Sequence, residues 1–329
     1  MDVYLYKLLF KSGVHFGDTG IDLENVQESV SSDAIFSALI NTINIYYGVK
    51  EAGELIGRFL HTPPFVLSSL FVYYKDSYFL PKPMDDSFIP EALKRAKSKD
   101  LKRLKWLEKS DFIKWQCQDS LTIENINDMQ KKQIEYKNAF VKEIRPRVVL
   151  DRMTQQSSIY HCGYIHFKHD AGLYGLVAFY DNGFIEKFKN ILLLLGQTGI
   201  GGEKTYGCGM FDTVFEPADS VFINILSAKT DNYTLLSLYH PANDEQGNLI
   251  NSLVSYDIIR KKGWIATGRN ALPLKRKSAG FITEGSVLKN AIKGCLIDVT
   301  PDNPPPDTLS HKVYRNGYAF TAPLREATQ

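Results

Sequence analysis

The sequence lacks a strong charge of either sign, and it lacks any long apolar run. Across 329 residues the net charge is only +2, so any attraction to nucleic acid must come from local patches rather than from a whole-protein field. The longest aliphatic run, ILLLL at 191–195, is far too short to span a bilayer. We therefore expect a soluble, cytoplasmic protein with no membrane partner.

Cysteine is also scarce, and the spacing of the cysteines is not that of a disulfide framework. Cys117, Cys162, Cys208 and Cys295 lie far apart in the chain and form no CxxC motif. This pattern excludes a disulfide scaffold and a cysteine-based zinc site. It is typical of a protein that works in a reducing cytoplasm.

Histidine is present, but not in an arrangement that suits a metal. His161 and His169 would face one side of a strand and His166 the other, so we expect no metal ion and no cofactor. His15 stands apart, in the glycine-framed segment 13–17. A histidine in such a loop serves either as a general acid or base or as a hydrogen-bonding structural residue.

Aromatic residues are abundant, at 12% of the chain, and they favour strands. Most of them are expected to pack in a core, although aromatic rings also stack on bases. We predict a first strand at 3–10 and a hairpin at 66–80. Between them, the Ser31, Ser32 and Asp33 cluster predicts the capped start of a helix.

The middle of the chain carries a basic stretch. Residues 91–109 are predicted to form one lysine-rich helix, and residues 117–145 a polar, mobile insertion. The helix is typical of a solvated face, or alternatively of a contact surface for phosphates or an acidic partner. The alternating stretch at 145–170 then predicts a long hairpin with its polar tip at 154–158.

The second half repeats this mixed content. Strands are predicted at 222–226, 233–239, 253–259 and 313–322. Regular strand–helix alternation is missing, which argues against a doubly wound sheet. The pattern favours an α+β fold with antiparallel sheets and two ferredoxin-like units, the second one degenerate. We place the N-terminal domain at 1–216, with its basic insertion at about 85–145, and the C-terminal domain at 217–329.

A glycine-rich loop follows a predicted helix that ends at Gly196. It contains Gly199, Gly201, Gly202, Gly207 and Gly209, with one lysine among them. Loops of this composition commonly hold an anion.

Two nucleotide-binding motifs fail on spacing in this loop. The pattern of the NTPase loop would need glycine at Thr198 and Glu203, and the dinucleotide pattern would need glycine at Lys204. The loop also follows a helix and so lies at the negative end of the helix dipole. Backbone N–H groups and Lys204 would then hold an extended polyanion. The alternative is that the glycines only allow tight turns and close packing.

Several segments together resemble one family. They are GVHFG at 13–17, SSDAIFSAL at 31–39, YFLPKPM at 78–84, RVVLDRMTQQSSIY at 147–160, GIGGEKTYGCGMF at 199–211 and HKVYRNGYAFTAP at 311–323. In this order they resemble the RAMP superfamily of CRISPR proteins. Within it, the sequence is most similar to the fourth subunit of the type III-A Csm effector complex, nearly end to end.

The resemblance implies a fold and a role. Members have two ferredoxin-like (RRM-like) modules and are non-catalytic. They cap the 5′ tag of crRNA, and they bind the large polymerase and nuclease subunit and the first backbone RAMP subunit. Base pairing reads the sequence in RNA-guided recognition, so this subunit would read RNA backbone and shape.

The resemblance also implies site residues. The RNA-binding set is His15, Arg147, Arg152, Gly199, Ile200, Gly201, Gly202, Lys204, Thr205, Tyr206, Gly207 and Gly209. The hairpin at 147–160 corresponds to the family thumb, and its two arginines would contact phosphates. Lys204 would contact phosphate and Tyr206 would stack on a base. Glu203 departs from the more basic family pattern. Beside RNA it would weaken binding unless it is paired, and Lys204 is the expected partner.

Two alternatives remain open. One is a RAMP-type CRISPR RNA endonuclease that uses His15 as general acid or base. The other is a protein-only scaffold whose basic helix at 91–109 docks on another subunit.

Overall fold

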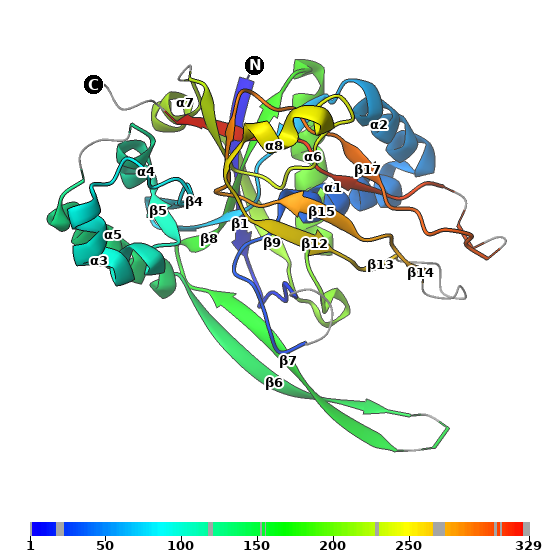
Figure 1. Cartoon of the computed structure of the whole chain (residues 1–329). Coiled ribbons are helices and arrows are strands. Elements are labelled where there is room, and N and C mark those ends of the chain that lie inside the picture. Colours follow the sequence, from blue (N-terminus) through cyan, green and yellow to red (C-terminus); the bar gives the residue numbers. More distant parts are fainter. Residues whose placement is uncertain are drawn as a thin grey trace.

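The chain folds into antiparallel sheets with helices packed against them, as the α+β prediction requires (Figure 1). The computed structural model describes residues 2–17, 23–117, 121–151, 153–154, 156–227, 230–265, 274–305, 308–309 and 311–324. No helix in these ranges is both long enough and apolar enough to cross a membrane.

The larger sheet has seven antiparallel strands, in the order β5-β4-β3-β8-β1-β9, with β2 also paired to β8. The strands are β1 (Asp2–Phe10), β2 (Phe65–Leu67), β3 (Phe71–Tyr74), β4 (Ser77–Pro81), β5 (Trp106–Glu108), β8 (Ala171–Phe179) and β9 (Phe211–Pro217). Helices lie on the connections from β1 to β2 and from β8 to β9. The β3-β8-β1-β9 order with these connections is the ferredoxin-like β-α-β-β-α-β arrangement.

The helices on these connections are α1 (Ser32–Tyr47), α2 (Val49–His61) and α6 (Ile185–Thr198). In α1 the buried residues Ile35, Phe36, Leu39 and Ile43 recur at helical spacing, as predicted. Ser31 occupies the N-cap position but makes no side-chain capping hydrogen bond, so the expected cap is wrong.

The Ser31–Asp33 cluster instead receives the C-terminal half of the chain. Lys261 Nζ donates to Ser31 Oγ, and Arg315 forms a buried ion pair with Asp33. The Asn316 backbone N–H donates to the same carboxylate, at 3.0 Å. Ser31 and Asp33 do form hydrogen bonds, but with residues of the C-terminal half of the chain rather than with the first turn of α1.

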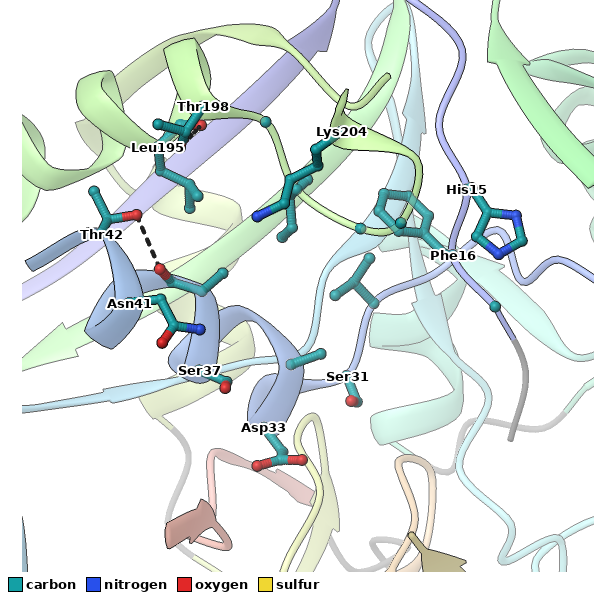
Figure 2. Close-up of a pocket in the computed structure, with 18 of the residues that line it drawn as sticks. His15, Phe16, Ser31, Asp33, Ser37, Asn41, Thr42, Leu195, Thr198 and Lys204 are labelled. Atoms are coloured by element: carbon teal, nitrogen blue, oxygen red, sulfur yellow. Dashed lines mark hydrogen bonds between the residues drawn. The ribbon is translucent and has the colours of Figure 1, made fainter. Parts of the chain in front are cut away.

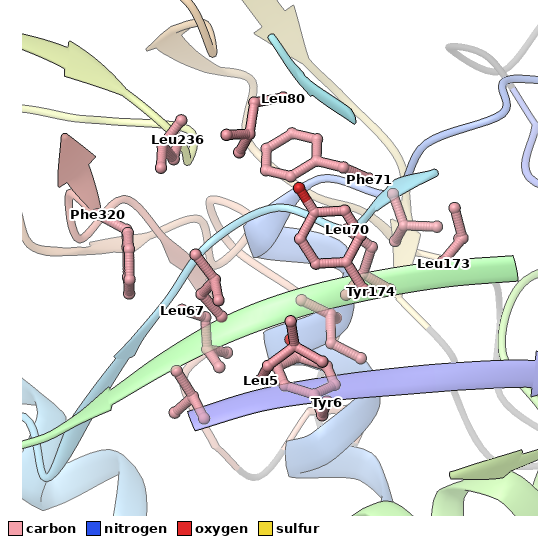
Figure 3. Packing of buried hydrophobic residues seen from close by; sticks show 14 of the residues in the cluster. Leu5, Tyr6, Leu67, Leu70, Phe71, Leu80, Leu173, Tyr174, Leu236 and Phe320 are labelled. Atoms are coloured by element: carbon pink, nitrogen blue, oxygen red, sulfur yellow. The ribbon is translucent and has the colours of Figure 1, made fainter. Parts of the chain in front are cut away.

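Most of the aromatic residues pack in the core, as expected. Phe188 makes edge-to-face contacts with Tyr6, Phe65 and Phe179, with ring centroids 5.1–5.8 Å apart. Figure 3 shows Leu236 and Phe320, from the C-terminal half, beside residues of the larger sheet. One hydrophobic cluster therefore runs across position 216, and the division into two domains there stays a prediction.

The basic insertion differs from both of its predictions. It forms α3 (Glu91–Arg103), the sheet strand β5, α4 (Lys109–Gln116) and α5 (Ile123–Asn138). The single helix over 91–109 is wrong because Leu107 and Glu108 pair with β4 as a strand. The mobile insertion is wrong for the described part of 117–145, because α5 has a capping box at Thr122 and buries Ile126 and Tyr136.

The hairpin begins before the predicted 145–170, and it is longer than the 147–160 segment that the resemblance assigned to the thumb. It consists of β6 (Phe140–Leu150) and β7 (Ser157–Phe167), paired in register along their whole length. It projects far from the body in Figure 1. Its base is anchored by a bridge between Ile165 and Val14, while Val148, Val149 and Leu150 near its tip are exposed.

The smaller sheet has the order β11-β16-β10-β19. Its strands are β10 (Asn232–Leu235), β11 (Leu253–Ser255), β16 (Val287–Lys289) and β19 (Thr321–Leu324). This is the strand order of the ferredoxin-like part of the larger sheet. The first connection carries a 3-10 helix at Gln246–Asn248 followed by α8 (Leu249–Ser252), and the described part of the connection to β19 carries no helix. The assignment of a degenerate second ferredoxin-like unit stays a prediction.

Some boundaries in the second half were predicted wrongly. Residues 222–226 were expected as a strand but lie in α7 (Ser220–Ser227), which buries Phe222 and Ile225 at helical spacing. A short apolar run does not distinguish a strand from a helix. The predicted strands at 253–259 and 313–322 are each divided in two. The remaining strands are β12 (Ile258–Lys261), β13 (Trp264–Ile265), β14 (Leu274–Lys275), β15 (Ala279–Ile282), β17 (Leu296–Asp298) and β18 (Tyr314–Asn316).

Candidate nucleic-acid interface

The glycine loop closes the end of α6 and leads into β9. The helix continues through Gly196 to Thr198, beyond its predicted end. Gly196 tolerates no side chain, because a Cβ there would lie 2.4 Å from the Phe211 carbonyl oxygen. Gly199 ends the helix with a φ of 78°, which favours glycine.

Packing accounts for several of the loop glycines. A Cβ on Gly209 would lie 2.1 Å from the Ile200 carbonyl oxygen, and one on Gly201 would lie 2.6 Å from the His15 carbonyl oxygen. Gly207 differs, because its φ of 78° favours glycine while the space around it is open. The loop is therefore a tightly folded element rather than an open cradle, and its close-packing explanation holds for most of its glycines.

His15 ties three segments together. Its backbone carbonyl accepts a hydrogen bond from the Gly202 N–H at 2.8 Å, and its Nδ1 lies 2.8 Å from the Gly163 carbonyl oxygen on β7. A carbonyl only accepts, so Nδ1 carries the proton. The residue is only 6% exposed. His15 thus joins the N-terminal segment, the glycine loop and the hairpin.

Arg147 on β6 reaches the glycine loop. Its guanidinium lies 4.2 Å from the ring centroid of Tyr206 and donates to the Tyr164 hydroxyl at 2.6 Å. Burial raises the pKa of Tyr164 to about 12, so this hydroxyl stays protonated near neutral pH. The contact brings together two residues that were predicted separately, one on the thumb and one on the loop.

Glu203 pairs differently from the expectation. Its carboxylate lies 3.9 Å from the guanidinium of Arg147, so the expected pair with Lys204 is wrong. Glu203 has a φ of 56°, in the left-handed region that non-glycine residues rarely adopt. The negative charge of Glu203 therefore offsets Arg147 rather than Lys204.

Lys204 belongs to a different surface, a cavity of about 380 Å³ between the glycine loop and α1. Figure 2 shows Lys204 extending over this cavity toward Ser37 and Asn41 of α1. Gly199, Ile200, Gly201, Gly202 and His15 also line it. We call it the glycine-loop cavity.

The C-terminal half supplies three further cations to this cavity: Lys261, Arg276 and Arg315. Arg315 is paired with Asp33, which is the acidic residue that lines the cavity within the described ranges. Burial, and then the positive charge of Arg315, lower the pKa of Arg276. Within the part of the chain that the structure describes, Arg276 Nε is buried without a hydrogen-bond partner. Such a cation is suited to an anionic ligand.

Sequence reasoning missed these three cations. Arg276 stands in the basic run Lys275–Lys277. Lys261 stands in the basic run Arg260–Lys262 and lies on β12, and Arg315 lies on β18. Only tertiary packing brings the three to the glycine loop.

The other predicted site residues have different surroundings. Thr205 and Tyr206 are exposed, and Tyr206 has 63% of its surface accessible. The Ile200 side chain is buried and its N–H donates to the Gly209 carbonyl oxygen at 3.0 Å, so only its backbone borders the cavity. Arg152 lies outside the described residues.

The three clustered histidines have separate acidic neighbours. His161 lies 3.7 Å from Glu24, and His166 lies 3.1 Å from Glu143. His169 lies beside Asp170. Within the ranges that the structure describes, no group of three or more metal-ligating side chains comes together.

Known proteins are similar to this chain over most of its length. Residues 228–324 match the family described as the CRISPR Csm4 C-terminal domain. A Csm4 protein of Thermococcus onnurineus is 29% identical over 303 residues, which cover 88% of this chain and 89% of the relative. A Csm4 protein of Methanocaldococcus jannaschii is 24% identical and covers 98% of both chains.

Solved structures share the fold. A Csm3–Csm4 subcomplex of the type III-A CRISPR–Cas interference complex contains a chain that matches with a TM-score of 0.66 at 20% identity, over 99% of this chain and 100% of that one. A Csm1–Csm4 cassette in complex with cA4 contains one that matches with a TM-score of 0.64 at 22% identity, over the full length of both. With the matched C-terminal domain, the nearly full-length relatives make this chain similar to Csm4 proteins over most of its length, and the solved structures share its fold.

Proposed function

We propose that the protein is a non-catalytic RNA-binding subunit of a type III-A Csm complex that caps the 5′ tag of crRNA in antiviral defence. The observation that carries this proposal is the glycine-loop cavity. It gathers Lys204, Lys261, Arg276 and Arg315 against a single described carboxylate, that of Asp33. A confined excess of positive charge favours a polyanion.

The geometry supports recognition of RNA backbone rather than of sequence. Lys204 and Arg276 supply charge for phosphates, and the glycine loop forms one wall of the cavity. On the hairpin side of the loop, exposed Tyr206 offers ring surface for a base. Each of these contacts tolerates any tag sequence.

The same proposal assigns two protein partners. The matched solved structures are Csm1–Csm4 cassettes and a Csm3–Csm4 subcomplex. We infer by similarity that this chain contacts the large polymerase and nuclease subunit and the backbone RAMP subunit, and so joins them.

The surroundings of His15 favour a structural role over general acid–base catalysis. The ring is buried, and Nδ1 is committed to the Gly163 carbonyl. That leaves only Nε2 for proton transfer, whereas a nuclease needs both an acid and a base at the scissile phosphate. Labelled repeat RNA incubated with the wild-type protein should stay intact. Cleavage that is lost in His15→Ala would establish the nuclease instead.

Salt-dependent RNA binding tests the cavity. The double variant Lys204→Ala, Arg276→Ala should bind tag-bearing single-stranded RNA more weakly, measured by fluorescence anisotropy. The slope of log affinity against log salt should fall by about 1.4, at roughly 0.7 for each lost phosphate contact. The matched control is Arg95→Ala, Lys99→Ala, which removes the same two charges from an exposed helix face. An unchanged slope in the cavity variant would contradict the proposal.

A further inference from the structure

We propose that the insertion contains a second binding site, for the phosphates of single-stranded RNA, distinct from the glycine-loop cavity. The site is a cavity of about 680 Å³ between the end of α3, the strand β5, the helix α5 and the start of β6. We call it the insertion cavity. The inference does not rest on the proposed function of the glycine loop.

Besides Lys142, four cations line this cavity: Lys102, Arg103, Lys105 and Lys137. All four are exposed. Within the described ranges, none of them forms an ion pair, and the acidic residue Glu28 in the wall is paired with Lys142 at 2.8 Å. The cavity therefore carries a local excess of positive charge that the protein does not neutralise.

Elsewhere on the insertion, lysines are mostly paired. Lys94 lies 3.0 Å from Asp86, Lys97 lies 3.2 Å from Asp100, and Lys132 lies 2.9 Å from Asp111. Lys109, Lys114 and Lys131 also have aspartate partners. The insertion thus provides carboxylates for its lysines over much of its surface, but not at the cavity.

Helix dipoles explain part of this arrangement. Lys102 and Arg103 lie in the last turn of α3 and Lys137 in the last turn of α5, where a cation is favoured by about 0.3–1 kcal/mol. The dipole does not explain Lys105, which follows the helix. It also does not explain why two helix ends and a strand converge on one hollow.

An aromatic wall gives the cavity a second property of RNA-binding surfaces. Trp106 stacks on Tyr136, with ring centroids 5.3 Å apart and an angle of 15° between the rings. The buried Gln133 accepts hydrogen bonds from the backbone N–H groups of Lys105 and Trp106, at 3.1 and 3.2 Å. This holds the wall rigid, so that a base can pack against the half-buried Trp106.

Continuity with the hairpin favours RNA over an acidic protein as the occupant. Phe140 and Lys142, at the start of β6, line the insertion cavity. Further along the same strand, Arg145 and Arg147 lead to the glycine loop, where Arg147 meets Tyr206. One strand of the protein therefore joins two basic surfaces, and an extended polyanion can follow it.

The test compares two double variants on the same helix. Lys102→Ala, Arg103→Ala removes two cavity cations, whereas Arg95→Ala, Lys99→Ala removes one arginine and one lysine that are equally exposed but lie outside the cavity. The probe is a fluorescent 30-nucleotide single-stranded RNA, bound to the full-length chain over a range of salt. We expect the cavity variant to bind roughly tenfold more weakly, with a salt slope lower by about 1.4. The control should bind like the wild type.

Three results would overturn the inference. One is wild-type RNA binding by the cavity variant, and another is an equal loss in both variants, which would mark a general charge effect. The third is wild-type RNA binding combined with lost co-purification of a Csm1 or Csm3 partner, which would mark a protein-docking surface. Thermal unfolding of both variants checks that they fold. RNA binding of the Lys204→Ala, Arg276→Ala variant is measured in parallel. It shows whether the glycine-loop cavity binds RNA independently of the insertion cavity.

Discussion

The glycine-loop cavity and the insertion cavity are both basic, but they hold their charges differently. In the first, Arg315 is buried against Asp33 and Arg276 is half-buried beside it. In the second, the cations are exposed and have no described carboxylate partner. The first site is thus organised before any ligand arrives, whereas the second acts through charge that solvent and salt screen. Substitutions at the first should change folding as well as binding, and substitutions at the second should change binding alone.

The largest expected effect is the loss of the buried ion pair. Asp33→Ala leaves Arg315 buried without its partner, and it also removes the acceptor of the Asn316 N–H. We expect the free energy of unfolding to fall by about 3–5 kcal/mol, measured by urea denaturation. Asp128→Ala, which breaks an exposed pair with Lys131 on the insertion, is the control and should leave stability unchanged. Equal stability of the two variants would refute the claim that the buried Asp33–Arg315 pair organises the first cavity.

A smaller effect is expected from the backbone of the glycine loop. Gly209→Ala combines a positive φ with a 2.1 Å contact to the Ile200 carbonyl oxygen, and should cost about 3 kcal/mol in unfolding free energy. Gly207→Ala has the strained φ but open space, and should cost about 1–2 kcal/mol. Thermal unfolding of the pair measures the difference. If both variants lose the same unfolding free energy, close packing does not explain why the loop needs glycine at position 209.

The smallest expected effect concerns Glu203. Glu203→Gln keeps the size and the backbone strain of this residue but removes the charge that offsets Arg147. We expect tag-RNA affinity to rise about threefold and the salt slope to rise by about 0.7, because Arg147 becomes available to a phosphate. Fluorescence anisotropy measures both. Weaker binding would show that Glu203 positions Arg147 instead of neutralising it.

Elements with long, repeated patterns were predictable from the sequence. The spacing of Ile35, Phe36 and Leu39 identified α1, and the alternation after Arg145 identified the hairpin. Prediction failed where a short segment had two possible structures. Phe222 and Ile225 fit a strand or a helix equally well, and β5 is a strand only because β4 pairs with it. Such choices depend on partners distant in the chain.

The candidate site was only half predictable, for a similar reason. The glycine loop and Lys204 are contiguous in the sequence, so composition was enough to identify them. The spacing of the glycines was enough to exclude the two nucleotide-binding motifs. The contact of Arg147 with Tyr206 and Glu203 joins a hairpin to a loop more than fifty residues away. The pairing of Glu203 could not be assigned from neighbours in sequence, because its partner Arg147 lies on the hairpin.

The sequence by itself determined the α+β class, the long hairpin, the glycine loop and the resemblance to RAMP proteins, because each resides in a contiguous run of residues with a local physical meaning. Tertiary structure decided which charges remain available. It committed Asp33 to Arg315, brought Arg276 and Lys261 to the glycine loop, and left Lys102 and Arg103 without described partners. The physical reason is that the effective charge of a side chain depends on its neighbours in space and on its burial, which pattern and composition do not specify.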